Sequence, residues 1–405
     1  MPNDSRSAEI LIAGGGVMGA ALAYWITRLK PGCDVVIVER DPSFQRASSS
    51  LSASSIRQQF SCAVNVSLSR FGFEFLRDAA THLSLDGQAP ELSLHADGYL
   101  YLAHAGQAMA LEAAHAVQTG LGAEIALLDP AELGRRFPWL NTEDLALGAL
   151  GLSGEGWFDG PALHRALLSK ALAQGARRLT GEVVGVHRGA SSEGKAAGGA
   201  DAGAIQGVVL ADGRSVPCDT LVIAAGAWSA RLARMAGEPI AISASRRTVF
   251  VLSSPATLPG CPLLIDPEGF WLRPEGRLLL TGAPPIETEP DLPLEPDWRE
   301  LDEAQWMRIA HRIPSLAAMR IERAWAGYYD MHDYDHNALI GPSVSVPGLW
   351  YLCGFSGHGM QHAPGAGLAL AEWMMLGRPS TVDVTPLSPQ RVALEQPLIE
   401  LNVIG

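Results

Sequence analysis

Short apolar runs that lead directly into glycine-rich turns occur at three widely separated places in the chain. The runs cover residues 10–13, 221–223 and 350–353. Uninterrupted apolar runs of this length are typical of strands that are buried on both faces of a parallel sheet. The pattern therefore predicts one parallel sheet that is assembled from three distant segments of the chain.

The first run opens a complete strand–turn–helix–strand unit. A helix is predicted over about residues 17–30, and the apolar run that follows it ends in Glu39. Gly14 permits the tight turn, Gly16 allows backbone N–H groups to approach a pyrophosphate, and Gly19 lets the helix pack close to the strand. Glu39 is placed to accept hydrogen bonds from ribose hydroxyls. The unit predicts a dinucleotide site and leaves both FAD and NAD open as the ligand.

Helices and further strands are predicted from apolar periodicity in the rest of the chain. The predicted helices cover residues 64–80, 107–120, 130–136, 160–174, 301–311 and 365–376. Asp159 is the predicted cap of the helix at 160–174, and Pro161 lies in its first turn. The clearest additional strands lie at 94–104, 183–186, 205–210, 248–252, 270–273 and 278–281. A Gly/Ala/Ser-rich insert at 189–204 is predicted to form a mobile hairpin tip.

Composition and charge narrow the possible partners. The 405 residues are 47% hydrophobic and 18% charged, and this length favours two domains. A formal net charge of −13 repels phosphate backbones, so we expect no nucleic-acid partner. No apolar stretch is long enough to be a transmembrane segment, and the polar N-terminus leaves no room for a signal peptide. The five cysteines show no CxxC pair and no metal spacing, which favours reduced thiols, no metal site and a cytoplasmic location.

Three motifs in the same order resemble those of the FAD-dependent glycine oxidase and sarcosine oxidase group, a D-amino acid oxidase-like family. They are the glycine turn with Glu39, Ala-Ala-Gly-Ala-Trp at 224–228 and Gly-Phe-Ser-Gly-His-Gly at 354–359. The resemblance covers nearly the whole chain. It implies FAD as the cofactor, with the late loop and the helix after it around the isoalloxazine ring.

One subgroup of this family is more similar still. It comprises the FAD-dependent oxidoreductase domain-containing protein that assists mitochondrial complex I assembly, and its bacterial relatives. The similarity lies at residues 56–60, 325–330 and 359–365, and over the C-terminal residues 382–404. It does not imply a particular substrate.

The expected fold class is α/β, with a Rossmann-like FAD-binding domain interleaved with an α+β substrate domain on an antiparallel or mixed sheet. The FAD-binding domain is expected to be discontinuous, with the substrate domain inserted into it and a short tail at the C-terminus. The expected boundaries are 1–85, 150–240 and 335–385 for the FAD-binding domain, 86–149 and 241–334 for the substrate domain, and 386–405 for the tail.

The motifs and the resemblance together predict the residues that hold FAD. Serines after the second strand are expected near the diphosphate or the ring, the backbone at Val184 near adenine, and amides of the late loop near the N1–C2=O edge. A purely structural role of that loop is the alternative. The predicted cofactor residues are Gly14, Gly16, Val17, Met18, Gly19, Glu39, Arg40, Ser48, Ser49, Ser50, Val184, Ala225, Gly226, Trp228, Gly357, His358, Gly359, Met360 and Gln361.

Five residues are predicted at the substrate. The resemblance implies that Arg57 binds a carboxylate, which its planar guanidinium can grip through two bonds. A surface ion pair is the alternative. Arg273 is a second candidate for the same role, and Tyr328 and Tyr329 are expected either to wall the pocket or to belong to the core. His358 is a candidate base, although its place between two glycines favours a backbone role.

Departures from the family pattern limit what the resemblance implies. Gly327-Tyr328 occupies the place of the flavin-linking cysteine, so FAD is expected to be non-covalent. Leu280 replaces a lysine that promotes reaction with oxygen, which argues against a fast oxidase. Pro284 replaces an active-site histidine, and Gln361 and Tyr329 replace a carboxylate-binding lysine and arginine.

The function expected from these observations is oxidation of the C–N bond of an amino acid or N-substituted amino acid by hydride transfer to flavin N5. A dehydrogenase is favoured over a fast oxidase, with a quinone, a flavoprotein or oxygen as the electron acceptor. Oxidation of a 2-hydroxy acid is an alternative that needs a base, for which His362 is the nearby candidate. The other alternative is a flavin-binding assembly or interaction protein without metabolite turnover.

Overall fold

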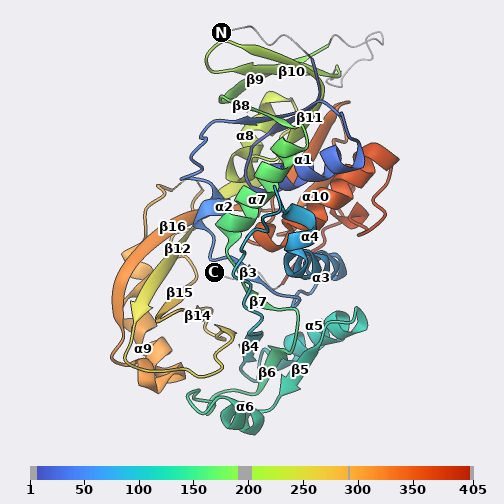
Figure 1. Ribbon diagram of the computed structural model, residues 1–405. Coiled ribbons are helices and arrows are strands. Elements are labelled where there is room, and N and C mark those ends of the chain that lie inside the picture. The colour runs from blue at the N-terminus through green and yellow to red at the C-terminus, as the bar shows by residue number, and fades with distance from the viewer. Residues whose placement is uncertain (1–6, 190–202, 291, 402–405) are drawn as a thin grey trace.

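Two eight-stranded sheets organise the protein in a computed structural model that describes residues 7–189, 203–290 and 292–401 (Figure 1). In the view of Figure 1, the first sheet and its helices fill the upper part and the second sheet extends below it. Most of the predicted hairpin tip at 189–204 lies outside the described residues.

The first sheet contains the predicted parallel core. Its strands, in spatial order, are β17 (Leu339–Pro342), β18 (Leu349–Cys353), β11 (Ser215–Ile223), β1 (Ala8–Ala13), β2 (Val35–Glu39) and β8 (Arg177–Thr180), and β10 (Ile205–Leu210) and β9 (Val183–Arg188) extend from β11. Strand β1 pairs in parallel with both β11 and β2, and β11 pairs in parallel with β18. The prediction that three distant segments form one parallel sheet is therefore confirmed.

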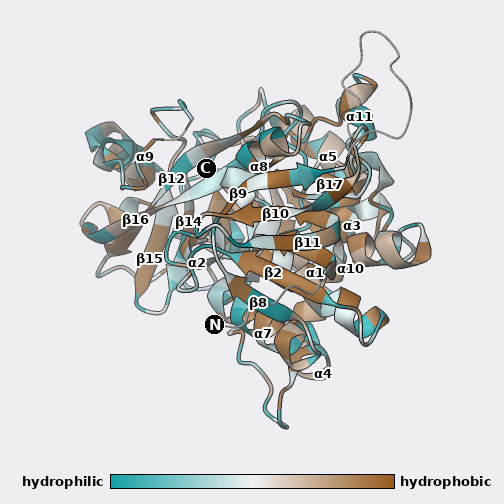
Figure 2. Ribbon diagram, turned by 90° about the horizontal axis from the view of Figure 1, so that it is seen from above, coloured by the Kyte–Doolittle hydropathy of each residue, from teal (hydrophilic) through white to brown (hydrophobic). Residues whose placement is uncertain are grey.

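Alternate residues of β1 belong to two different cores, which explains why the run is apolar throughout. Ile10 and Ile12 pack in the cluster that holds the inner faces of α1 (Val17–Leu29) and α10 (Gly359–Leu376). Leu11 and Ala13 pack in the other cluster, together with Leu232 of α8 (Ser229–Met235) and the strands β9 and β10. Because successive side chains of a strand point to opposite faces, both faces of this sheet have to be apolar. Figure 2 shows β2 and β11 as predominantly hydrophobic strands in the same sheet.

The helices of this half cover the sheet or lie at its edge. They are α1 (Val17–Leu29), α2 (Ser48–Leu51), α3 (Ala63–Arg77), α4 (Ala79–Leu83), α7 (Gly160–Ala173), α8 (Ser229–Met235), α10 (Gly359–Leu376) and α11 (Gln390–Ala393). Helix α1 packs against α10 and α7 (Figure 1). The predicted cap of α7 is confirmed, because the side chain of Asp159 accepts a hydrogen bond from the backbone N–H of Ala162 at 2.8 Å.

The last long helix begins earlier than predicted. Helix α10 starts at Gly359, whereas the sequence favoured a start at residue 365, and Pro364 lies inside the helix. Close packing explains the glycines that follow. A Cβ added at Gly367 would lie 2.9 Å from the backbone of Ala21 in α1, and one at Gly365 would lie 3.1 Å from Leu68 in α3. Proline and glycine therefore mark a tightly packed helix here, not a loop.

The second sheet is mixed, as expected. Its order is β16 (Arg320–His332), β12 (Ile242–Ser253), β15 (Leu278–Gly282), β14 (Trp271–Glu275), β13 (Leu263–Ile265), β4 (Tyr99–Ala103), β6 (Leu147–Gly151) and β5 (Ile125–Leu128). All its pairs are antiparallel except the parallel pair of β13 and β4. Helices α5 (Ala108–Gly120), α6 (Pro130–Arg136) and α9 (Glu303–Arg312) lie in this half, and the short strands β3 (Ser55–Ile56) and β7 (Gly156–Trp157) form a separate pair.

Three properties of the described residues bear on partners and cofactors. No helix within residues 7–189, 203–290 and 292–401 is long and apolar enough to cross a membrane. All five cysteines are buried and unpaired. In the same part of the chain, no group of three or more His, Cys, Asp and Glu side chains is arranged to hold a metal ion.

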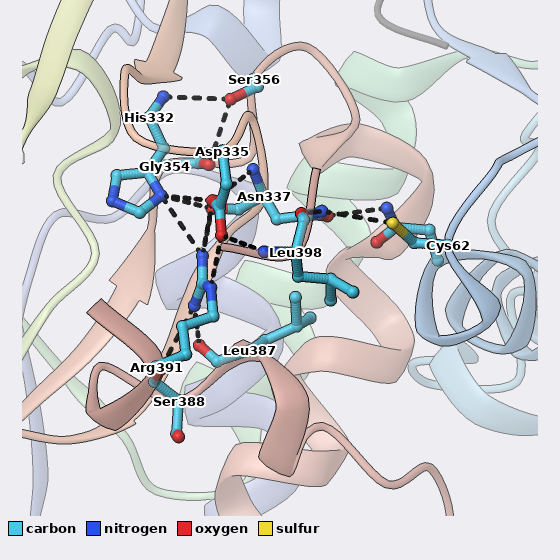
Figure 3. A network of polar contacts seen from close by, with 11 residues as sticks. Cys62, His332, Asp335, Asn337, Gly354, Ser356, Leu387, Ser388, Arg391 and Leu398 are labelled. Carbon is cyan, nitrogen blue, oxygen red and sulfur yellow. Dashed lines mark hydrogen bonds and ion pairs between the residues drawn. The ribbon is translucent and has the colours of Figure 1, made fainter. Parts of the chain in front are cut away.

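A buried network around Asp335 holds the C-terminal segment (Figure 3). Arg391 donates through Nε to Asp335 Oδ2 at 2.7 Å and through Nη2 to Oδ1 at 2.9 Å. His332 Nδ1 lies 3.0 Å from Asp335 Oδ1, and the backbone N–H of Leu398 donates to Oδ2 at 3.0 Å. Burial acts in the opposite direction, but the hydrogen bonds from His332 and Arg391 hold the pKa of Asp335 well below its usual range. Asp335 is therefore a buried carboxylate whose charge depends on Arg391.

We expect Arg391→Ala to lower the free energy of unfolding by about 3–5 kcal/mol, because removing one partner of a buried ion pair leaves the other charge uncompensated. Urea unfolding at neutral pH measures the change. Arg378→Ala is the matched control, since Arg378 is exposed, and its loss should stay within about 0.5 kcal/mol. Equal effects of the two substitutions would show that the network contributes no net stability.

Candidate active site

The glycine turn after β1 packs directly on the turn after β11. Gly14 has a φ of +113°, and a Cβ added to it would lie 2.3 Å from the carbonyl oxygen of Ala224. A Cβ at Gly19 would lie 2.0 Å from the carbonyl oxygen of Gly14. The backbone N–H of Ala224 in turn donates to Ala13 O at 3.0 Å. Two of the three motifs are therefore in contact at the ends of neighbouring parallel strands.

Glu39 and Ser49 fix the backbone around the start of α1. The Glu39 carboxylate accepts hydrogen bonds from the backbone N–H of Gly15 at 2.8 Å and of Asp41 at 2.9 Å. Ser49 Oγ accepts the backbone N–H of Val17, the first residue of α1, at 2.9 Å. This arrangement presents the N-terminus of a helix and a carboxylate side by side, as a nucleotide diphosphate and its ribose require.

A cavity of about 250 Å³ begins at this turn and is lined by residues from both sheets. Its wall includes residues of the glycine turn, α2, the 224–228 motif, β16 and the 354–359 loop. The predicted site residues that line it are Gly14, Gly16, Val17, Met18, Glu39, Arg40, Ser48, Ser49, Arg57, Ala225, Gly226, Trp228, Tyr328, Tyr329, Gly357, His358, Gly359, Met360 and Gln361.

Four predicted residues do not line the cavity, namely Gly19, Ser50, Val184 and Arg273. Gly19 serves the packing of α1 against the turn. Val184 is 39% exposed, whereas its neighbour Val183 is buried and lines the cavity. Successive side chains of a strand point in opposite directions, so the side chain of Val183 lines the cavity and that of Val184 does not. The expected contact of the Val184 backbone with adenine stays a prediction. Ser50 lies one position beyond Ser49 in the short helix α2.

Arg273 is buried but does not line the cavity, and its contacts lie both within the second sheet and outside it. Its guanidinium donates to the carboxylate of Glu275 and, through Nη2, to the carbonyl oxygen of Ala53 at 3.0 Å. Trp271, two residues earlier in β14, lines the cavity instead. The contacts indicate that Arg273 connects β14 to the segment before β3.

Arg57 is buried in the wall of the cavity. It follows β3, is 3% exposed, and donates through Nη1 to the carbonyl oxygen of Gln59. Its guanidinium carbon lies 3.9 Å from the ring centroid of Phe60 and 5.7 Å from that of Tyr101. The side chain of Gln361 accepts the backbone N–H of Arg57 at 2.8 Å. The start of α10 therefore helps to position the arginine.

Glu155 also positions this segment, and the sequence reasoning missed it. Its carboxylate accepts the backbone N–H groups of Gln58 and Gln59, the latter at 3.1 Å, and the side-chain amide of Gln59 at 2.9 Å. It is fully buried, and burial raises its pKa to about 7. The signal in the sequence is a lone acidic residue between Gly154 and Gly156 in otherwise apolar surroundings.

We expect Glu155→Gln to make stability less dependent on pH between 4.5 and about 7. In this range the folded protein keeps a proton on Glu155 that the unfolded chain has lost, so the native protein loses stability as the pH rises. Glutamine has nearly the same shape and no proton to lose.

Urea unfolding of both proteins at about pH 5 and about pH 8 measures the effect. From the lower to the higher pH, the free energy of unfolding of Glu155→Gln should rise by about 1–3 kcal/mol relative to that of the unchanged protein. Each pKa unit between the folded and the unfolded state corresponds to about 1.4 kcal/mol. Parallel profiles for the two proteins would contradict the assignment of the raised pKa to Glu155.

The C-terminal segment reaches back to the residues that follow Arg57. The Glu400 carboxylate accepts the backbone N–H of Ser61 at 2.8 Å, the backbone N–H of Cys62 at 3.0 Å and the side-chain amide of Asn65 at 2.9 Å. Glu400 is 1% exposed. The predicted tail is thus part of the wall behind the arginine-bearing segment.

Tyr328 and Tyr329 close the cavity from β16. The ring of Tyr329 packs against Gly357, where an added Cβ would lie 2.4 Å from Tyr329 Cε2. The hydroxyl of Ser48 donates to the carbonyl oxygen of Tyr328 at 2.7 Å, and the Tyr328 ring lies edge-on to Trp228 at 5.9 Å. The two tyrosines therefore line the cavity while they tie the second sheet to the loops of the first.

His358 lines the cavity and has a buried ring nitrogen that the described residues leave unpaired. It is 4% exposed, and among the described residues its Nε2 has no hydrogen-bond partner. Burial, together with the charge of Arg57, holds its pKa well below the usual range, so the imidazole is neutral. His362 differs, because its Nε2 lies 2.9 Å from Ser69 Oγ and it does not line the cavity.

A family model described as "DAO: FAD dependent oxidoreductase" matches residues 9–373. The chain belongs to the DAO family. FAD-dependent oxidoreductase domain-containing protein 1 of Xenopus laevis is 36% identical over 424 residues, which cover 98% of this chain and 85% of that protein. Mitochondrial dimethylglycine dehydrogenase of Homo sapiens is 26% identical, over 95% of this chain and 44% of that protein. Among solved structures, L-proline dehydrogenase from P. horikoshii superposes with a TM-score of 0.82 at 24% identity, over 97% of this chain and 99% of that one.

Membership of the DAO family makes FAD the cofactor, and the cavity fits it. The close approach at Gly14 and Gly19, the helix N-terminus held by Ser49 and the carboxylate of Glu39 match the needs of the dinucleotide part. Among the described residues that line the cavity, none is a cysteine, so the wall offers no thiol for a covalent link to the flavin. The expected cofactor is therefore confirmed for this DAO-family chain.

Proposed function

We propose that this FAD-dependent oxidoreductase oxidises the C–N bond of an amino acid or N-substituted amino acid. The observation that carries the proposal is Arg57, a buried arginine in the wall of the same cavity as the 354–359 loop. A guanidinium in this position can bind a substrate carboxylate through two parallel hydrogen bonds. When bound, FAD supplies a hydride-accepting ring.

The residues that hold FAD form part of this proposal. The backbone of the glycine turn and Ser49 would hold the diphosphate, Glu39 would accept hydrogen bonds from the ribose hydroxyls, and Val183 would contact the adenine. The backbone N–H groups of Gly357, Gly359 and Met360 would donate to the pyrimidine edge of the flavin ring, where a helix N-terminus stabilises negative charge. The backbone N–H of His358, also expected there, donates instead to the carbonyl oxygen of Phe355 at 2.9 Å. Support comes from the lining of the cavity, which includes all of these residues.

Each wall of the substrate part has a defined role in the proposal. Tyr99, Trp271 and Tyr329 line the cavity and exclude water from the reacting carbon. His358 is neutral and offers Nε2 as a hydrogen-bonding atom. A neutral histidine of lowered pKa is a weak base and does not readily take a proton from a charged amine. The substrate amine therefore has to arrive uncharged, and the reaction is faster at a pH above the pKa of that amine.

The electron acceptor, the domain division and the compartment are also part of this proposal. Leu280 is buried in an apolar cluster with Trp271 and Val249, which supports a dehydrogenase that passes electrons to a quinone or flavoprotein faster than to oxygen. The two sheets support the expected division into an FAD-binding and a substrate domain. The unpaired cysteines support a reducing compartment such as the cytoplasm.

Anaerobic reduction of the flavin tests the function. Amino acids, N-alkyl amino acids and 2-hydroxy acids are added to the purified holoprotein, and loss of the flavin absorbance at about 450 nm is the signal. The proposal requires reduction by an amine. Reduction by hydroxy acids alone would show that the protein oxidises 2-hydroxy acids instead of amines. His362, the base expected for that alternative, lies at hydrogen-bonding distance from Ser69 Oγ. If no metabolite reduces the flavin, a role as an assembly or interaction protein replaces both.

A further inference from the structure

The 354–359 loop has a strained backbone. Gly354 has a φ of +76°, Ser356 a φ of +49° and Gly357 a φ of +90°. Ser356 carries its side chain in the left-handed region, where residues other than glycine are uncommon, and it is fully buried. A backbone of this kind persists only where the surrounding structure holds it. The loop therefore depends on partners outside itself.

Strand β16 of the second sheet supplies these partners. The carbonyl oxygen of Asp330 accepts the backbone N–H of Ser356 at 3.1 Å, and the Oδ2 atom of its side chain accepts that of Gly354 at 2.7 Å. The backbone N–H of His332 donates to Ser356 Oγ at 3.0 Å (Figure 3). Asp330 therefore holds the loop through both its main chain and its side chain, and it does so from the other sheet.

The carboxylate of Asp330 is also a charge in the wall of the cavity. Asp330 is half-buried and lines the cavity together with Phe355 and Gly357 of the loop. The protein around the carboxyl replaces water and raises its pKa to about 6, although hydrogen bonds from the backbone N–H groups of Phe355 and Gly354 act to lower it. The group is therefore ionised at neutral and alkaline pH and carries a proton in mild acid.

Two titratable groups near Asp330 stay neutral. Burial, together with the charge of Asp330, raises the pKa of the Cys353 thiol at the end of β18 above its usual range. The imidazole of His358 in the loop is neutral because its pKa is well below the usual range. His332 acts on Asp330 from the same strand. A substitution at Asp330 leaves His332 in place, so a comparison of the two proteins isolates the charge of Asp330.

The other charged side chains of the wall stand on different elements. Arg247 lies on β12, which is next to β16 in the sheet. Helix α2 and the turn Gly226–Trp228 also pack on β16 and contain no titratable side chain. The arginines keep their charge at every pH used below, and the whole set is the same in both proteins that are compared. Among the described residues, the set is Glu39, Arg40, Asp41, Arg46, Arg57, Glu182, Arg231 and Arg247.

We propose that Asp330 is a positioning residue that holds the 354–359 loop to β16, places a negative charge beside the flavin ring and thereby lowers the reduction potential of bound FAD. This rests on the part of the proposed function that sets the loop against the ring. Reduction adds negative charge to the ring, and a carboxylate in a site from which water is excluded opposes that addition. The electron pair taken from the substrate then passes more readily to a quinone or flavoprotein acceptor.

The reduction potential of the holoprotein tests the proposal without any amine. Dithionite supplies the electrons under anaerobic conditions, and a dye of known potential shares them with the flavin, so that the two absorbances give the equilibrium constant. At about pH 8, Asp330→Asn should favour the reduced flavin about 10- to 30-fold more than the unchanged protein does, which is about 30–45 mV for a two-electron couple. At about pH 5, where Asp330 itself carries a proton, the difference should fall below about 3-fold.

Asp333→Asn is the matched control. It removes the same charge one residue beyond the end of β16, where the Asp333 side chain is exposed and accepts the hydroxyl of Ser243 at 2.8 Å. Its potential should equal that of the unchanged protein at both pH values. If Asp330→Asn retains too little FAD, Asp330→Ser carries the same test, because it also lacks the charge and keeps an oxygen that accepts hydrogen bonds.

Equal potentials of Asp330→Asn and the unchanged protein at about pH 8 would overturn the proposal, and so would an equal shift at both pH values, which is the result of a merely structural role. The outcome is separate from that of the proposed function, because the dye titration needs no substrate. If the pH-dependent shift appears but no amine reduces the flavin, Asp330 keeps its role and the proposed function fails. If amines reduce the flavin and the potential does not respond to Asp330, the proposed function stands and the role of Asp330 fails.

Discussion

Replacing Gly14 with alanine is expected to give a protein that lacks FAD. The added Cβ would lie 2.3 Å from the carbonyl oxygen of Ala224, and that atom belongs to the backbone of the neighbouring turn. The φ of +113° adds strain for any residue with a side chain. Either β1 or the 224–228 turn has to move, and both line the cofactor cavity. The absorbance at about 450 nm relative to protein measures bound flavin after purification.

Gly32 provides the matched control. Its φ is +86°, but nothing lies within 4 Å of the position of a Cβ. Gly32→Ala therefore carries the strain without the collision, and we expect a loss of about 1–2 kcal/mol of stability with full FAD content. A Gly14→Ala protein that binds FAD as well as Gly32→Ala does would show that the turn is free to adjust, and that the collision does not control cofactor binding.

Replacing Arg57 with alanine is expected to lower kcat/KM by about 10²- to 10³-fold, because truncating a buried charged partner costs about 2–5 kcal/mol. The loss should appear mainly as weaker substrate binding, because the carboxylate keeps the same charge before and after the C–N bond is oxidised. Arg57→Lys keeps the charge but not the planar fork, so it should recover only part of the loss.

Anaerobic stopped-flow measurements with the best amine from the substrate panel separate the dissociation constant from the rate of flavin reduction. Arg165→Ala is the control, since Arg165 lies on the exposed face of α7, with a side chain that is 67% exposed. FAD content and thermal stability are compared first, because Arg57 also contacts Phe60 and Gln59. An unchanged dissociation constant in Arg57→Ala would rule out Arg57 as the carboxylate anchor.

Features that depend on consecutive residues could be predicted from the sequence. The glycine turn, Glu39 and the cap at Asp159 each lie within one short segment, and each has local steric or hydrogen-bonding needs that only a few residue types meet. The three apolar runs predicted a parallel sheet because burial on both faces leaves no polar positions.

Features that depend on strand register could not be predicted. Arg273 and Arg247 are both arginines in strands of the second sheet, yet only Arg247 lines the cavity. Because a shift of one residue moves a side chain to the other face of a sheet, such choices need the pairing of strands that lie far apart in sequence. Glu155 was missed for the same reason, since its partners are 96 and 97 residues away.

The strand order of the first sheet has a consequence for synthesis on the ribosome. Strand β1 leaves the ribosome first but pairs with β11, which is made much later. Strand β11 in turn cannot complete its pairing until β18, at residues 349–353, has been made. Until then the nascent chain exposes an unpaired strand edge and the apolar surface that α10 later covers, and such intermediates are prone to aggregate. The pocket for FAD can therefore be completed only near the end of translation. Stalled or shortened chains would be unable to capture the cofactor and would depend on chaperones until the last helix is made.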